Sequence, residues 1–283
     1  MLFGSRLPTR FNASISPWGT VKTAHFMLVR SLGKTGISVS AIGYGAVKIG
    51  RNQQTKYGNF KLPDDKDVKN LLHGLLDLGI NLIDTAPAYG LSESRIGNTL
   101  KGHRRRLVLS TKVGETFING NSHHDFSSTA IEQSVVTSLK LLKTDHLDIV
   151  SIHSNGQDQH ILEQTDAVKT LEKIRKKGWA RAIGFSGYRL ESELSCLDWA
   201  DIMMIEYHPE NTIREKLIDR AAAAGVGVLV KKGLDSGRIA PDVGIAHALA
   251  KQEVSSLIIG SLNFRHLTEN CALAATLEPT DLS

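Results

Sequence analysis

Several features common in other protein classes are missing from this 283-residue sequence. Its two cysteines, Cys196 and Cys271, lie far apart without Cys-x-x-Cys spacing, which argues against both a disulfide framework and a cysteine-based metal site. Apolar residues make up 41% of the chain, yet no apolar run approaches the roughly 20 residues needed to cross a bilayer. We therefore expect no membrane span.

Acidic residues are absent from positions 1–63, although nine lysines and arginines occur there. This imbalance gives a local reason for the net charge of +5. Elsewhere the basic residues are spread along the chain, and no groove-reading motif accompanies them. We therefore expect no nucleic-acid partner.

Strand and helix signals alternate from Val39 onward, a pattern typical of a parallel sheet with helices outside it. Two helices have apolar positions on one face, and the second precedes Gly178, where a left-handed cap suits the chain. Those positions are Ile131, Val135, Leu139 and Leu142, then Val168, Leu171 and Ile174. The expected strands are Val39–Tyr44, Asn81–Asp84, Val108–Lys112, Ile149–His153, Ala180–Ser186, Ile202–Glu206, Val226–Val230 and Ser256–Ile259.

Eight such strands in a chain of this length fit a (β/α)₈ TIM barrel, which takes about 250 residues. No Pro/Gly-rich linker divides the stretch, so we expect a single α/β domain. A doubly wound open sheet is the competing architecture and would require a glycine-rich turn after the first strand. Residues 43–48, Gly-Tyr-Gly-Ala-Val-Lys, lack the G-x-G-x-x-G spacing of that turn.

Charged and polar side chains stand where three successive strands end. Asp84, Lys112 and His153 close three apolar runs, and Tyr89 follows Asp84 within five residues. Taken singly, each has a structural explanation as a turn cap, a packed ring, a solvated strand end or a core histidine. Together they indicate an active site, because barrel sites are built from the carboxyl ends of several strands and unpaired charge there is costly.

Three longer polar loops should lie at the same end of the barrel: Gly50–Pro63, Glu115–Ser127 and Ser154–Gln164. Tyr57 and Phe117 could wall a substrate pocket or pack onto the barrel rim. His123 and His124 are adjacent, but no third ligand accompanies them, so we predict no metal site.

The segments that carry these residues resemble the aldo-keto reductase family. Asp84, Tyr89, Lys112 and His153 correspond to its Asp-Tyr-Lys-His tetrad, in the family's order. The match also covers residues 89–97, 134–153 and 260–270, and it extends from about Arg30 to about Ala275. It implies a (β/α)₈ barrel that reduces carbonyls with a nicotinamide cofactor.

The resemblance implies a separate role for each residue of the tetrad. Carbonyl reduction needs a hydride from the cofactor and a proton from the protein. Tyr89 would give the proton, with its pKa lowered by the Lys112 ammonium. Asp84 would hold Lys112, and His153 would orient the carbonyl or share the proton.

Residues 258–270 look like the strand, loop and helix that bind the adenosine end of NADP in this family. Their charge favours NADP over NAD, although a histidine stands at the usual arginine or glutamine position. A helix cap with a solvated basic turn would explain the same pattern. The resemblance implies cofactor contacts from Gly260, Ser261, Asn263, Arg265, His266, Glu269 and Asn270.

The nicotinamide end departs from the family pattern at three positions. Gly187 replaces an asparagine, Met204 a carboxamide-binding glutamine, and Lys231 a ring-stacking aromatic residue. Either Glu206 substitutes for the glutamine or the nicotinamide is held less tightly. The cofactor contacts that the resemblance still implies here are Ser186, Glu206, Lys231, Gly233, Leu234 and Ser236.

The first 26 residues admit two explanations. A stretch with arginine and serine but no acid can be an organellar transit segment. Alternatively the start codon is misplaced, because the sequence from Met27 resembles the usual opening of these reductases. We expect a disordered extension over 1–26, the barrel over 27–283, and a cytoplasmic location unless residues 1–26 direct organelle import.

The function that follows is NADPH-dependent reduction of small-molecule aldehydes or ketones, reversible as alcohol oxidation. A regulatory subunit that binds cofactor with little turnover is the alternative, since potassium-channel β subunits resemble this family. A barrel hydrolase using Asp84 with Glu206 or His153 is a third possibility, but it leaves Tyr89 and Lys112 without a role.

Overall fold

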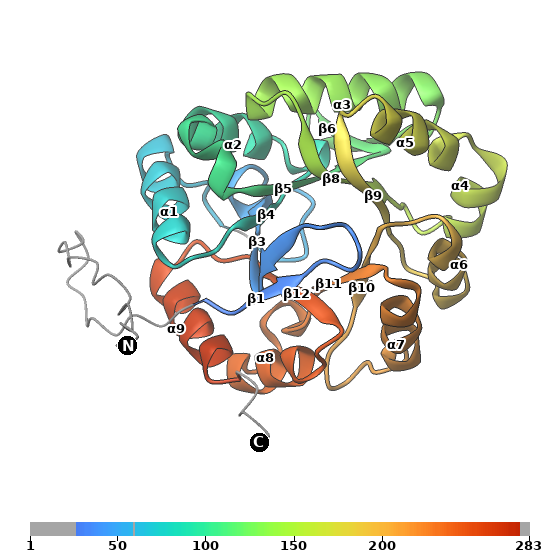
Figure 1. Ribbon diagram of the computed structural model, residues 1–283. Helices are drawn as coiled ribbons and strands as arrows, with labels where there is room; N and C mark the ends of the chain where they lie inside the picture. Colours follow the sequence, from blue (N-terminus) through green and yellow to red (C-terminus); the bar gives the residue numbers. More distant parts are fainter. Residues whose placement is uncertain (1–26, 59, 278–283) are drawn as a thin grey trace, which may run out of the picture.

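The computed structural model describes residues 27–58 and 60–277, and these form a closed barrel of eight parallel strands surrounded by helices (Figure 1). The expected extension over residues 1–26 lies outside the described residues. The strands of the barrel are β3 (Ile42–Gly45), β4 (Leu82–Asp84), β5 (Val108–Val113), β8 (Leu147–His153), β9 (Ala180–Ser186), β10 (Ile202–Glu206), β11 (Gly227–Lys231) and β12 (Val254–Ile259). The predicted (β/α)₈ barrel is confirmed, and closure of the sheet between β12 and β3 rules out the open alternative.

The helices pack on the outside of this ring (Figure 1). Their apolar stripes contribute to the buried core between helices and barrel. They are α1 (Asp65–Asp77), α2 (Ser92–Leu100), α3 (Ser128–Leu142), α4 (Asp158–Gln164), α5 (Ala167–Lys176), α6 (Leu190–Ser195), α7 (Glu215–Ala224), α8 (Pro241–Ala250) and α9 (Phe264–Ala275). Short 3₁₀ turns are η1 (Ala46–Ile49), η2 (Pro87–Tyr89), η3 (Lys101–Arg106), η4 (Cys196–Asp198) and η5 (Asp235–Gly237). The two helices expected from apolar periodicity are α3 and α5, and Gly178 after α5 has the predicted left-handed φ of 75°.

One predicted strand was too long at its start. The apolar run Val39–Tyr44 is divided between β2 (Ser38–Ser40), which pairs with β1 (Val29–Ser31), and barrel strand β3. The chain changes pairing partner at Ala41, whose backbone N–H donates to Leu28 O. An apolar run does not reveal such a change, because both strands bury apolar side chains.

The β1–β2 hairpin closes the end of the barrel where the strands begin, and it crosses the middle of the ring in Figure 1. Leu32, Ile37 and Val39 from this hairpin pack against the interior of the barrel, on residues such as Leu82 and Ile149. Chemistry that needs access to the barrel is therefore confined to the opposite end, where the strands finish.

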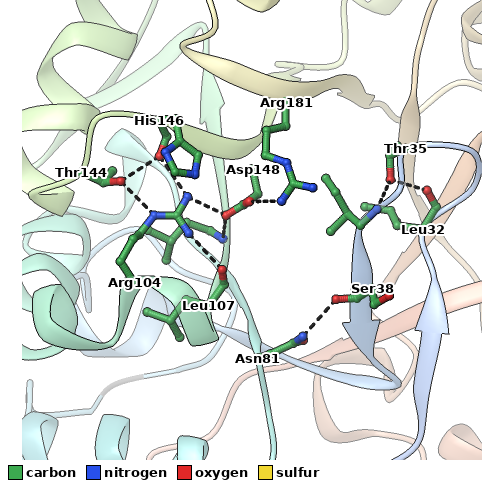
Figure 2. A network of polar contacts seen from close by, with 12 residues as sticks. Leu32, Thr35, Ser38, Asn81, Arg104, Leu107, Thr144, His146, Asp148 and Arg181 are labelled. Atoms are coloured by element: carbon green, nitrogen blue, oxygen red, sulfur yellow. Dashed lines mark hydrogen bonds and ion pairs between the residues drawn. The ribbon is translucent and has the colours of Figure 1, made fainter.

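A polar network ties the strands together at the hairpin end (Figure 2). Asp148, near the start of β8, is 1% exposed. Its Oδ1 accepts from Arg181 at 2.8 Å, while its Oδ2 accepts from Leu109 N at 2.9 Å and pairs with Arg104 at 2.8 Å. Each carboxylate oxygen is thus satisfied, as a buried charge requires.

Two of the three loops expected at the far end contain regular structure. Residues 115–127 include the antiparallel hairpin of β6 (Glu115–Ile118) and β7 (Asn121–His124). Asn119 and Gly120 form its turn with φ of 51° and 81°, the combination that asparagine and glycine favour in tight hairpins. Residues 154–164 include α4. The loop predictions were wrong there because both segments are polar and lack apolar alternation.

Candidate active site

The four residues expected at the strand ends lie at the open end of the barrel. Asp84 ends β4, His153 ends β8, and Lys112 is the penultimate residue of β5. Tyr89 comes from η2, the turn after β4. Strand order places β4, β5 and β8 side by side, so these side chains converge although they are up to 69 residues apart (153 − 84).

Asp84 and Lys112 form a buried ion pair. The Lys112 ammonium lies 2.6 Å from Asp84 Oδ2 and donates to Thr85 O at 2.9 Å, while Ser110 donates to Asp84 Oδ1 at 2.9 Å. Asp84 is 3% exposed and Lys112 is 2% exposed. Of the three ammonium protons, these contacts occupy two, which leaves one beside the ring of Tyr89, whose centroid is 5.0 Å from Nζ.

The Tyr89 ring lies near both Lys112 and His153. Its ring meets the His153 imidazole edge to face, with centroids 6.2 Å apart and planes at 88°. The turn that holds it ends at Gly90, which has φ of 60° and approaches Gly50 O so closely that a Cβ there would lie 2.6 Å from this oxygen. Glycine is therefore required directly after the tyrosine.

The Tyr89 phenol departs from the expected electrostatics. Burial and then the negative charge of Asp84 raise its pKa well above 10, whereas a lowering by Lys112 was expected. Burial of the phenol is the main reason, and the Lys112 ammonium is itself paired with Asp84 at 2.6 Å. Tyr89 thus stays protonated near neutral pH, the form that can donate a proton.

His153 is paired with a carboxylate that the sequence interpretation missed. Its Nδ1 lies 2.9 Å from Glu115 Oε2, and the two side chains are 17% and 13% exposed. Burial lowers the pKa of His153, and the nearby charge of Glu115 opposes that effect. The first residue of the β6–β7 hairpin therefore belongs to the site.

Arg51 fixes the loop that faces this hairpin. It donates to Gln53 O and Ala88 O, both at 2.9 Å, and its guanidinium lies 3.8 Å from the centroid of the Phe117 ring. Phe117 therefore packs on a buried arginine, which fits the expected packing on the rim. Tyr57, the other aromatic residue expected here, is 42% exposed.

Another buried carboxylate, from helix α2, contacts strand β5 next to Lys112. Glu93 of α2 is 1% exposed and accepts from Thr111 at 2.6 Å. Burial raises its pKa. Thr111 immediately precedes Lys112, so this contact fixes the part of β5 that carries the lysine.

Lys231, at the end of β11, points across the barrel mouth. Its ammonium donates to Ser186 Oγ at 3.0 Å and to Gly187 O at 2.8 Å, and it lies 4.8 Å from the centroid of Tyr188. Burial lowers its pKa to about 8. Two of the three departures from the family pattern, Gly187 and Lys231, therefore touch each other.

Glu206, at the end of β10, is already partnered within the chain. Oε1 accepts from Asn211 at 3.2 Å, and Oε2 pairs with Lys232. Met204, two residues earlier on the same strand, is 3% exposed and packs inside the barrel. A cofactor amide that bound Glu206 would therefore compete with Lys232 and Asn211.

The loop after β11 has an unusual backbone. Lys232, Asp235 and Ser236 have φ of 57°, 41° and 60°, values that side-chain-bearing residues seldom adopt. Gly233 also packs closely, since a Cβ there would lie 2.5 Å from Leu257. Such strain is often kept at ligand-binding loops, and this is the loop that contains Gly233, Leu234 and Ser236.

The neighbouring loop after β12 leads into α9. Asn263 caps this helix by accepting from Arg265 N at 3.0 Å, and Ser261 O accepts from the Tyr44 hydroxyl at 3.2 Å. Arg265 and Glu269 are exposed and paired at 2.8 Å. Gly260 and Ser261 precede the cap, His266 is exposed in the first turn, and Asn270 is buried one turn further on.

Neither a metal cluster nor a membrane-spanning helix is present in residues 27–58 and 60–277. No group of three or more His, Cys, Asp and Glu side chains there could hold a metal, and His123 and His124 lie on β7. Within the same ranges, no helix is both long and apolar enough to cross a bilayer.

A parallel barrel with a buried Asp-Lys pair, a tyrosine and a histidine at its open end defines a class of barrel enzymes suited to proton transfer. The chain belongs to the aldo/keto reductase family, whose model matches residues 41–243. This membership makes it an oxidoreductase of carbonyl groups, and enzymes of this family use NAD or NADP.

Individual relatives support the same placement. L-galactose dehydrogenase of Arabidopsis thaliana is 27% identical over 88% of this chain and 89% of its own. The 6-dehydroglucose reductase of Novosphingobium aromaticivorans is 27% identical over 78% of this chain and 75% of its own. A crystal structure from Pseudomonas aeruginosa assigned to the aldo-keto reductases has a TM-score of 0.83 and 41% identity, covering 90% of this chain and 97% of the other.

Proposed function

We propose that the protein reduces aldehyde or ketone carbonyls with NADPH and that Tyr89 supplies the proton. The observation that carries this proposal is the buried Asp84–Lys112 pair, which leaves one ammonium proton beside Tyr89. A hydrolase would need neither this lysine nor this tyrosine. The sugar-related names of two relatives make aldoses and their oxidised forms the first substrates to try.

We assign each residue of the tetrad the following part in the proposed reaction. Asp84 holds Lys112 in place, and Lys112 donates a hydrogen bond to the tyrosine oxygen as that oxygen loses its proton. Tyr89 passes its proton to the carbonyl oxygen as hydride reaches the carbonyl carbon. His153, which packs edge to face against the tyrosine ring, positions the carbonyl oxygen by a hydrogen bond.

NADPH, when bound, supplies the hydride. We propose that the loops after β11 and β12 hold its phosphates, because they are neighbours in the barrel and because α9 begins with backbone N–H groups that suit an anion. Arg265 and His266 are the cations for the extra phosphate of NADPH, and Glu269 and Asn270 contact adenine. Ser186, Lys231 and Glu206 lie at the nicotinamide end.

The test is optical: NADPH oxidation with aldehydes, aldoses and quinones, compared between wild type and Tyr89→Phe. We expect turnover to fall by about 10²–10⁴-fold, as loss of a general acid does, with NADPH binding retained. Tyr207→Phe is the matched control, because it removes a hydroxyl from a buried ring that packs on His247. Full turnover in Tyr89→Phe would refute the assignment, whereas NADPH binding without turnover in the wild type would favour the regulatory alternative.

A further inference from the structure

Glu115 occupies a position that the backbone is built to provide. Between Lys112 and Glu115 the chain turns at Gly114, which has φ of 98°, and a Cβ there would lie 2.2 Å from the Phe126 ring. Only glycine fits both the conformation and the space. This turn ends β5 and begins β6, so the first side chain of the hairpin reaches back over the end of β8, where His153 lies.

The carboxylate of Glu115 is held at both oxygens. Ser122 on β7 donates to Oε1 at 2.7 Å, and Arg51 lies 3.6 Å from the same oxygen. Oε2 lies 2.9 Å from Nδ1 of His153. Burial alone would raise the pKa of Glu115, but the contacts with His153 and Ser122 outweigh it and hold the pKa at about 2. Glu115 is therefore an anion at every pH at which the protein would work.

The Nδ1 atom of His153 depends on this carboxylate. Among the described residues no group meets the geometry of a hydrogen bond with Nδ1, although Glu115 Oε2 lies 2.9 Å from it. The Cβ–Cγ torsion of histidine is soft, so the ring can turn to align with a carboxylate at this distance. Nδ1 therefore has one acceptor within reach, and that acceptor is charged.

Other charges around His153 act in the opposite direction. The ammonium groups of Lys112 and Lys231 and the burial of the ring disfavour the imidazolium, and they lower the pKa of His153. Glu115 is the anion in contact with the ring, while Arg51 and His124 face Glu115 from the other side. Burial, one carboxylate and two ammonium groups thus together set the charge of His153.

We propose that Glu115 is a positioning residue for carbonyl reduction: it keeps a proton on Nδ1 of His153, so that Nε2 alone gains or loses a proton toward the substrate. This inference rests on the proposed function. With Nε2 protonated, His153 donates a hydrogen bond to the carbonyl oxygen, and the transferred proton still comes from Tyr89. With Nε2 bare, His153 accepts a hydrogen bond from the alcohol and assists oxidation. Glu115 would then set the pH at which the site changes from one state to the other.

The direct test is nitrogen NMR of protein labelled with ¹⁵N-histidine, with the His153 signals assigned by their loss in His153→Gln. In the wild type we expect the neutral ring to carry its proton on Nδ1. Glu115→Gln should lower the His153 pKa by about one unit or more, the effect of removing an opposite charge at this distance. One unit is a tenfold fall, at fixed pH, in the ratio of charged to neutral rings. Glu132→Gln, which removes a surface carboxylate paired with Lys177, is the matched control and should leave His153 unchanged.

Turnover provides the second readout. The rate of reduction by the wild type should decline with rising pH around the His153 pKa measured by NMR. In Glu115→Gln the decline should occur at a lower pH, because the His153 pKa is lower. If turnover by Glu115→Gln is lower by the same factor at all pH values, Glu115 has only a structural role and the inference is overturned. An unchanged His153 pKa in Glu115→Gln would also overturn the inference. A neutral wild-type ring protonated on Nε2 would do the same, and that measurement does not depend on a variant that folds. Absence of any carbonyl reduction, with the NMR behaviour as expected, would instead refute the proposed function.

Discussion

The two ends of the barrel each contain a buried carboxylate paired with a cation, yet they differ in what remains unsatisfied. At the hairpin end, Asp148 is bound by Arg104, Arg181 and a backbone N–H, and Arg104 also donates to Leu107 O, Thr144 and His146 O. At the open end, the Lys112 ammonium keeps a proton beside Tyr89, and Nδ1 of His153 lacks an aligned partner within the described residues. A buried charge pair is therefore structural when its hydrogen bonds are complete and suited to chemistry when some are kept free.

The two ends also differ in how accessible the barrel interior is. The β1–β2 hairpin fills the barrel interior at the Asp148 end with apolar side chains. At the other end, Tyr89 and Glu115 lie just beyond β4 and β5, and Glu206 and Lys231 end β10 and β11. Substitutions that remove a buried charge should thus lower stability at the Asp148 end and lower turnover at the open end.

The largest effect is expected from Lys112→Met. It removes the hydrogen-bond donor beside Tyr89 and leaves Asp84 buried without its cation, so kcat/KM for carbonyl reduction should fall by about 10²–10⁴-fold. Steady-state NADPH oxidation measures this loss. Lys101→Met, an exposed lysine in η3 at the hairpin end, should leave kcat/KM unchanged, and an equal loss in both variants would break the comparison.

Asp148→Asn should show the reverse behaviour. Two arginines lose their carboxylate, and because Arg104 and Arg181 are partly exposed we expect a loss of about 2–4 kcal/mol in the free energy of unfolding. Denaturant unfolding measures this, with Asp145→Asn as the exposed control. Below the unfolding transition kcat/KM should stay within about twofold of wild type, because Asp148 lies at the end of the barrel opposite the candidate active site. Inactive but fully stable Asp148→Asn protein would contradict the division of roles.

The pH dependence of stability offers a third test, through Lys231. Its pKa is about 8 in the folded protein and 10.5 when unperturbed. Between these values the unfolded chain binds more protons, so the stability contributed by this group increases as pH rises through that window and is lowest below it. The difference in unfolding free energy between wild type and Lys231→Met should therefore move in favour of wild type from pH 8 to pH 10.5. A difference that is constant across this range would show that Lys231 is not destabilised as a cation.

The smallest effect is expected at the cofactor phosphate. Arg265→Ala should weaken NADPH binding by about tenfold, the loss of one exposed charge-assisted hydrogen bond, and leave NADH binding nearly unchanged. Fluorescence titration with both cofactors measures this. Arg105→Ala makes the same substitution at the hairpin end and should affect neither cofactor. If Arg265→Ala weakens NADPH binding and NADH binding equally, Arg265 does not contact the extra phosphate of NADPH.

The barrel itself could be predicted because its strands are short apolar runs separated by helices. Two of them, Ala180–Ser186 and Ile202–Glu206, were predicted with the bounds that β9 and β10 have. The β6–β7 hairpin was not, although its Asn119-Gly120 turn was a usable signal. Glu115 was missed with it, because only the turn at Gly114 brings this side chain to His153, 38 residues away (153 − 115).

The cofactor end shows the same limit. The sequence marked Gly187 and Lys231 as separate departures from a pattern, but their contact depends on closure of the barrel across β9, β10 and β11. Likewise the pairing of Glu206 with Lys232 and Asn211 joins side chains that no local pattern relates. Individual strand ends are visible in a sequence, whereas the partners across the barrel mouth are not.

Hydride and proton transfer to a carbonyl at the open end of the barrel can be tested by following deuterium. NADPH carrying deuterium at both C4 positions is incubated with the enzyme and an aldehyde that it consumes, and the alcohol is analysed by mass spectrometry. We expect one deuterium on the former carbonyl carbon, in wild type and in Tyr207→Phe, and hardly any product in Tyr89→Phe. Alcohol without deuterium, or labelled alcohol formed at the full rate by Tyr89→Phe, would contradict this mechanism.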